Sequence, residues 1–109
     1  MPFDEILADR VRDALASPGT LKEKKMFGGL AFLLDGNMCC GVHRDNLMLR
    51  LGVAGAEAAL TEPGVEPMNF TGRPMRGWVT IPVTELASDV DLAEWVRKAE
   101  RFAGSLPKK

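Results

Sequence analysis

The chain has 109 residues, of which 46% are hydrophobic and 27% are charged, and its formal net charge is −1. This length supports one domain, residues 1–109, that buries roughly 65% of the surface its unfolded chain exposes. The near-neutral charge excludes a global basic field that draws the protein to nucleic acid, and no apolar run approaches the ~20 residues of a membrane span.

The first predicted element is an amphipathic helix over residues 3–16, where apolar residues recur at near-helical spacing until Pro18-Gly19 ends it. This N-terminal stretch has no basic leader before an apolar run, so we expect no secretory signal and a cytoplasmic protein. Residues 20–27 predict a first strand, with Gly28-Gly29 as a bulge or bend after it.

Residues 25–51 predict three short strands joined by two tight turns. Residues 30–34 and 38–42 are apolar, and the Asp-Gly-Asn sequence between them is typical of a hairpin because Gly adopts positive φ without steric cost. A second turn, Arg44-Asp45-Asn46, leads into a strand over residues 47–51.

The register of these strands follows from side-chain alternation. A three-residue loop over residues 35–37 and a two-residue turn at 45–46 place nine apolar side chains on one face: Leu30, Phe32, Leu34, Met38, Cys40, Val42, Leu47, Leu49 and Leu51. The other face then carries a mixed set: Ala31, Leu33, Cys39, Gly41, His43, Met48 and Arg50. We therefore expect helices to cover the first face and to leave the second partly open.

The second half of the chain predicts two more helices and one or two more strands. Residues 53–60 form a short alanine-rich helix, and residues 61–76 form an ordered loop with a short edge strand around 68–70. Residues 77–82 predict a strand, residues 88–103 predict the clearest helix, and residues 106–109 predict a fraying tail. This order indicates a two-layer α+β domain, an antiparallel meander sheet with helices packed on one face.

Few residues offer chemistry. His43 is the only histidine, and we interpret it as solvent-facing or packed because no motif supplies a partner. Cys39 and Cys40 are adjacent in a strand, so we expect them to stay reduced and unpaired with each other. The predicted register puts Cys39 beside His43 and Arg50, which leaves a small thiol-dependent enzyme as a less favoured alternative. Otherwise we expect no enzyme, no catalytic residues, no cofactor and no metal site.

The basic residues fall into three groups along the chain: Lys22, Lys24 and Lys25; Arg73 and Arg76; and Arg97, Lys98, Arg101, Lys108 and Lys109. Cations late in a helix complement its dipole. Because the chain has no tyrosine and no RNP motif, direct nucleic-acid binding through a local Lys/Arg patch is the alternative rather than the first hypothesis.

A group of methionine and aromatic residues lies around the glycine-rich and proline-rich turns: Met26, Phe27, Met68, Phe70, Met75 and Trp78. One interpretation is an adaptable core edge beneath the long loop. The other is a surface for a protein partner, because such side chains repack against varied contours. The open face or an unpaired edge strand also suggests a homodimer.

The chain resembles the N-terminal domain of the TfoX/Sxy family of competence regulators over residues 4–103. The most specific feature is the sequence Met-Phe-Gly-Gly at residues 26–29, and the strand-turn-strand around Gly36 supports it. Further support comes from Leu47-Met48-Leu49-Arg50, from Gly77-Trp78 leading to Ile81-Pro82, and from Leu92, Trp95, Val96 and Ala99 in the last helix.

The resemblance implies a small α+β domain with an antiparallel sheet. It also implies a regulatory role in DNA uptake, since full-length members act alongside the cyclic-AMP receptor protein and carry a second, C-terminal helical domain. The chain ends before such a domain, so we expect a stand-alone N-terminal domain. Our first hypothesis is therefore a non-enzymatic module that binds a protein partner, such as a transcription factor.

Overall fold

The computed structural model of the protein describes residues 3–16, 20–26, 28–70 and 73–108. Its six strands are β1 Leu21–Met26, β2 Gly29–Leu34, β3 Asn37–His43, β4 Asn46–Arg50, β5 Glu66–Phe70 and β6 Arg73–Pro82. Its helices are α1 Glu5–Ala14, α2 Gly52–Ala59, the short 3-10 helix η1 Val83–Glu85 and α3 Asp89–Gly104.

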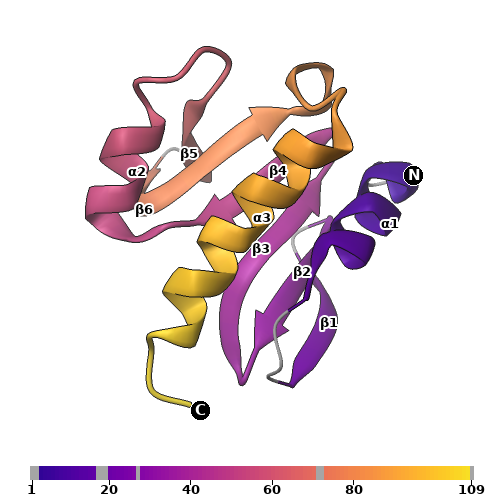
Figure 1. Ribbon diagram of the computed structural model, residues 1–109, viewed down its shortest axis with the longest axis vertical. Coiled ribbons are helices and arrows are strands. Elements are labelled where there is room, and N and C mark those ends of the chain that lie inside the picture. Colours follow the sequence, from indigo (N-terminus) through magenta and orange to yellow (C-terminus); the bar gives the residue numbers. More distant parts are fainter. Residues whose placement is uncertain (1–2, 17–19, 27, 71–72, 109) are drawn as a thin grey trace.

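All six strands form one antiparallel sheet in the order β1-β2-β3-β4-β6-β5 (Figure 1). Strands β1 to β4 are consecutive hairpins, and β6 returns beside β4 so that β5 forms the second edge. In Figure 1, α3 crosses one face of the sheet with α1 beside it, and α2 lies next to β6. The predicted two-layer α+β architecture is confirmed.

One core lies between the helices and the sheet. It joins Leu7 and Val11 of α1, Ala56 and Ala59 of α2, and Leu92, Val96 and Ala99 of α3 to the covered face of the strands. Among the predicted core residues of the sheet, Phe32, Val42, Leu47 and Leu49 are at most 1% exposed. None of the helices in the described ranges is long and apolar enough to cross a membrane.

The first predicted hairpin loop is one residue too long. Leu34 pairs with Asn37, so the turn contains only Asp35 and Gly36, with φ of 50° and 85°. Positive φ at both central residues is the geometry that matches the twist of the flanking strands. The register then shifts beside Phe32 and Leu33, since Phe32 pairs with Cys40 and Leu33 with Met38.

This shift is a β-bulge that leaves Cys39 as the extra residue of β3. The bulge corrects two predictions, because Met38 turns to the open face and Cys39 joins the core. Beyond the bulge, the predicted pairing of Leu30 with Val42 is restored. The second turn also moves one residue earlier: it contains Arg44 and Asp45, and Val42 pairs with Leu47.

Side-chain hydrogen bonds stabilise the start of α3 and hold the C-terminal tail against the sheet. Ser88 caps α3 by accepting a hydrogen bond from the backbone amide of Asp91 at 3.3 Å. The predicted fraying tail is wrong for Pro107, whose carbonyl accepts a hydrogen bond of 2.9 Å from the amide of Asn37. Asn37 is only 2% exposed, so this bond satisfies a buried polar group.

The two glycines of the Met-Phe-Gly-Gly sequence have separate structural roles. Gly28 has φ of +74° and so sits in the turn between β1 and β2. Gly29 pairs with His43 in the next strand, and a Cβ on Gly29 would lie 2.5 Å from the carbonyl oxygen of Val42. Any larger residue at 29 therefore pushes β2 away from β3.

We expect Gly29→Ala to lower the free energy of unfolding by about 1–3 kcal/mol, because the atom it meets belongs to the backbone and cannot rotate away. Urea denaturation measures the difference. Gly104→Ala is the matched control, since nothing lies within 4 Å of the added methyl group there. Equal stability of the two variants would contradict this explanation of Gly29.

Candidate functional site

The open face of the sheet carries a second, smaller hydrophobic cluster. Met48, Met68 and Trp78 are its buried members, at 7%, 5% and 8% exposure, and Met38 and Met75 pack against them half-buried. All five belong to strands, whereas every helical residue of the main core lies on the other side of the sheet. We call these five residues the methionine cluster.

The predicted partner surface is divided by the fold. Met68, Met75 and Trp78 come together in the β5–β6 hairpin and belong to the methionine cluster. Phe70 and Met26 lie in β5 and β1, the two opposite edges of the sheet, and only their backbone is described. Phe27 lies outside the described residues. The cluster also includes Met38 and Met48, which the group of residues chosen from the sequence did not contain. Met48 lies between Leu47 and Leu49, so side-chain alternation indicates that it faces the open side of the sheet.

The basic residues of β1 also separate onto two faces. Lys24 pairs with Ala31 and Lys22 with Leu33, so both lysines share the open face with those residues. Lys25 pairs with Leu30 and points to the helix side. The lysines that are consecutive in sequence therefore do not form one patch.

His43 and Arg50, predicted beside Cys39 on the mixed face, have other surroundings. His43 is half-buried at the end of β3, paired with Gly29 and Asn46. The guanidinium of Arg50 donates to the carbonyl of Met38 at 3.4 Å and lies 5.6 Å from the ring centre of Phe102 in α3. Arg50 thus links the end of β4 to the helix layer.

Both cysteines are free and fully buried in the main core. A hydrogen bond with Cys39, together with burial, raises the pKa of the Cys40 thiol well above its usual range, and the charge of Glu100 acts in the same direction. A nucleophilic cysteine needs the opposite conditions, namely access to solvent and a depressed pKa. The arrangement therefore favours two buried cysteines with a structural role.

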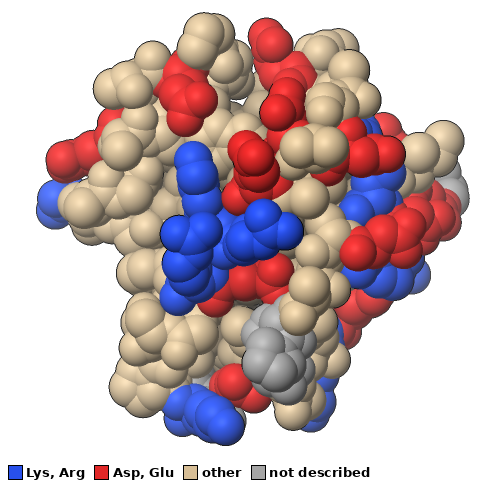
Figure 2. Space-filling view, in the orientation of Figure 1, with Lys and Arg blue, Asp and Glu red and all other residues tan. Residues whose placement is uncertain are grey.

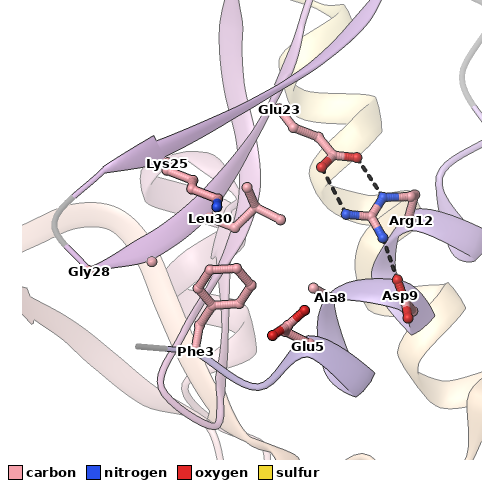
Figure 3. Close-up of a pocket in the computed structure, with 10 residues that line it drawn as sticks. Phe3, Glu5, Ala8, Asp9, Arg12, Glu23, Lys25, Gly28 and Leu30 are labelled. Atoms are coloured by element: carbon pink, nitrogen blue, oxygen red, sulfur yellow. Dashed lines mark hydrogen bonds and ion pairs between the residues drawn. The ribbon is translucent and has the colours of Figure 1, made fainter. Parts of the chain in front are cut away.

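A groove of about 500 Å³ separates α1 from β1 and β2 (Figure 3). Arg12 of α1 crosses it and donates to Glu23 of β1 at 2.5 and 2.8 Å, and it also pairs with Asp9. Lys25 points across Leu30 into the same groove in Figure 3. Arg12 thus neutralises charge within the groove. Its pairing with Glu23 links α1 to the β1 edge of the sheet.

No group of three or more His, Cys, Asp or Glu side chains that would hold a metal ion occurs in the part of the chain that the structure describes.

Comparison with known proteins identifies the fold family. The family model described as the TfoX N-terminal domain matches residues 13–103, from within α1 to the last turn of α3. The chain belongs to the TfoX N-terminal domain family. The comparison with curated proteins found no match, and neither did the comparison with solved structures. In this TfoX N-terminal domain, the match spans the methionine cluster and nearly all of α2 and α3, but only the end of α1.

We expect the thiols of this TfoX N-terminal domain to react slowly with Ellman's reagent while the protein is folded. Raising the pH to about 9 ionises an ordinary thiol, but a raised pKa keeps Cys40 protonated, so the slow rate should persist. The same protein in urea, with both thiols exposed, is the control. A folded-state rate near that of a small free thiol would contradict the buried assignment and favour thiol chemistry at Cys39.

The Arg12–Glu23 pair predicts a weak dependence of stability on pH. The hydrogen bond from Arg12 lowers the pKa of Glu23 in the folded state, so the pair stabilises above the ordinary glutamate pKa. That stability is lost as the pH falls through the lowered value. Both side chains are well exposed, at 44% and 39%, so the effect is about 0.2–1 kcal/mol.

Urea denaturation of Glu23→Gln should therefore show a deficit in the free energy of unfolding near neutral pH that shrinks as the pH falls below the ordinary glutamate pKa. Glu57→Gln, which changes an exposed glutamate of α2, is the matched control. A deficit that stays constant with pH would mean that the pair is not the cause.

Proposed function

We propose that this domain is a non-enzymatic regulatory module that binds a protein partner, such as a transcription factor, through the open face of its sheet. Membership of the TfoX N-terminal domain family supports the regulatory role in competence. A cytoplasmic location agrees with two free cysteines.

The observation that carries the choice of face is the methionine cluster. A buried face of a soluble domain usually gains a second layer, but here strand side chains cover one another. Methionine has three flexible torsions and a polarizable sulfur, so Met38 and Met75, which remain half-buried, repack cheaply against a partner. Lys22 and Lys24 on the same face supply a polar rim at its β1 edge.

We expect Met75→Lys to weaken capture of the partner by about tenfold or more, since a charge there must be desolvated on binding. The measurement is a pull-down with tagged domain from lysate of the native organism, with and without nuclease, quantified by mass spectrometry. Ile6→Lys is the matched control, because Ile6 is 76% exposed on α1, on the other side of the sheet. Both variants are first checked for folding by circular dichroism.

A protein that is captured by the wild type and by Ile6→Lys, and lost with Met75→Lys, supports the proposal. Equal capture by all three would remove the open face as the binding surface. If the captured protein is a second copy of the chain, the face forms a homodimer instead. Partners that disappear on nuclease treatment would favour the alternative, nucleic-acid binding through the Lys/Arg residues.

A further inference from the structure

A second groove, of about 470 Å³, runs between α2 and α3 on the helix side of the sheet. Trp95 and Phe102 form its α3 wall, Gly55 and Ala58 form its α2 wall, and Leu51 lies between them. Its surface is largely apolar. The rest of the chain buries Trp95 and Phe102 only partly. The groove lies on the opposite side of the sheet from the methionine cluster.

Both walls of this α2–α3 groove are single helix faces. Trp95, Lys98 and Phe102 are spaced i, i+3 and i+7 along α3, and these positions share one face over two turns, about 10 Å. Gly55 and Ala58 are spaced i and i+3 along α2. Small residues on one wall and large ones on the other leave room for a third helix to pack between them.

The large side chains of the groove are held in place before anything binds. A Cβ on Gly52 would lie 2.6 Å from the ring of Phe102, so the ring packs directly on the start of α2. Arg50 lies against the same ring, 5.6 Å from its centre. The ammonium of Lys98 lies 4.5 Å from the ring centre of Trp95. Such preorganisation lowers the entropy that binding must overcome.

The charges around the groove are distributed unevenly. Lys98 and Arg101 are exposed on its α3 side, and Glu62 lies on its α2 side. The adjoining hollow adds Asp91 and Glu94 from the first turns of α3. Figure 2 shows Lys and Arg side chains gathered over the middle of the face that carries α3, with Asp and Glu side chains above and below them. A ligand of the groove therefore meets Lys98 and Arg101 on its α3 side and Glu62 on its α2 side, and Lys98 also lines the adjoining acidic hollow.

We propose that the α2–α3 groove docks an amphipathic helix of a partner protein. Its apolar side chains lie against Trp95 and Phe102, and its carboxylates pair with Lys98 and Arg101. Charge complementarity favours a peptide over a nucleic acid, because Glu62 and its acidic neighbours would repel a phosphate backbone. The inference does not depend on the open-face assignment.

A displayed library of helical peptides of about 15 residues, randomised on one face, provides the test. Selection on the wild-type domain should enrich apolar residues at i, i+3 or i+4, and i+7, together with Asp and Glu. Fluorescence anisotropy of a labelled selected peptide then gives its Kd. The double variant Lys98→Glu/Arg101→Glu should raise that Kd about tenfold or more.

Arg97→Glu is the matched control, since Arg97 is an exposed cation of the same helix that does not line the groove. It should leave the Kd unchanged, and a peptide with Lys in place of its Glu should regain binding to the double variant. All the altered residues are exposed, so folding is retained and is verified by circular dichroism.

Three results would overturn the inference. The first is a selection without enrichment. The second is that the Kd of the selected peptides rises equally with Arg97→Glu and with the double variant, or that it rises only with Met75→Lys. In the latter case the open face would be the docking surface. The third is tight binding of a labelled single-stranded oligonucleotide that the double variant abolishes, which would make the patch a nucleic-acid surface.

Discussion

The three α-helices of the described chain all pack on one face of a six-stranded sheet, and the other face has to cover itself. Helical residues such as Leu7, Ala56 and Leu92 join the main core, whereas the second cluster draws only on strands. Long, flexible methionine side chains and Trp78 meet this constraint because they lie down over the sheet and shield one another. The result is a thin hydrophobic layer whose outer members stay half-buried, which is the physical basis for proposing this face as a contact surface.

The bulge in β3 determines which chemistry the sheet presents. By inserting Cys39 as an extra residue, it brings the Cys39 thiol into the core beside Cys40 and sends Met38 to the open face. One irregular residue therefore removes the reactive group from solvent and enlarges the methionine layer. The raised pKa of Cys40 follows from its hydrogen bond with Cys39 and from burial, since the charged form of a thiol is disfavoured where water is excluded.

The helix layer adds a different kind of surface. Contact between Gly52 and the Phe102 ring brings α2 close to α3 at one end, and small residues along α2 keep the space between the two helices open. Acidic residues near the start of α3 and basic residues towards its end also suit the helix dipole, so part of this charge pattern is structural. The pattern nevertheless places Lys98 and Arg101 on one side of the groove and Glu62 on the other, whereas the open face is adaptable and largely apolar. Two such surfaces on opposite sides would allow a small domain to bridge two partners.

Local signals in the sequence determined most of the elements and the inward face of most strands, although β6 begins at Arg73, inside the predicted loop over residues 61–76. Phe32, Leu47 and Leu49 are buried as alternation predicts, because a strand has a period of two and one face must leave water. The family was also visible in local motifs. Only the tertiary structure decided the placement of Cys39 and Met38, since a bulge depends on the partner strand. It also decided the burial of Asn37, whose amide is satisfied by a carbonyl 70 residues away. The α2–α3 groove exists only because the sheet holds two helices side by side, and no spacing along the chain encodes that distance.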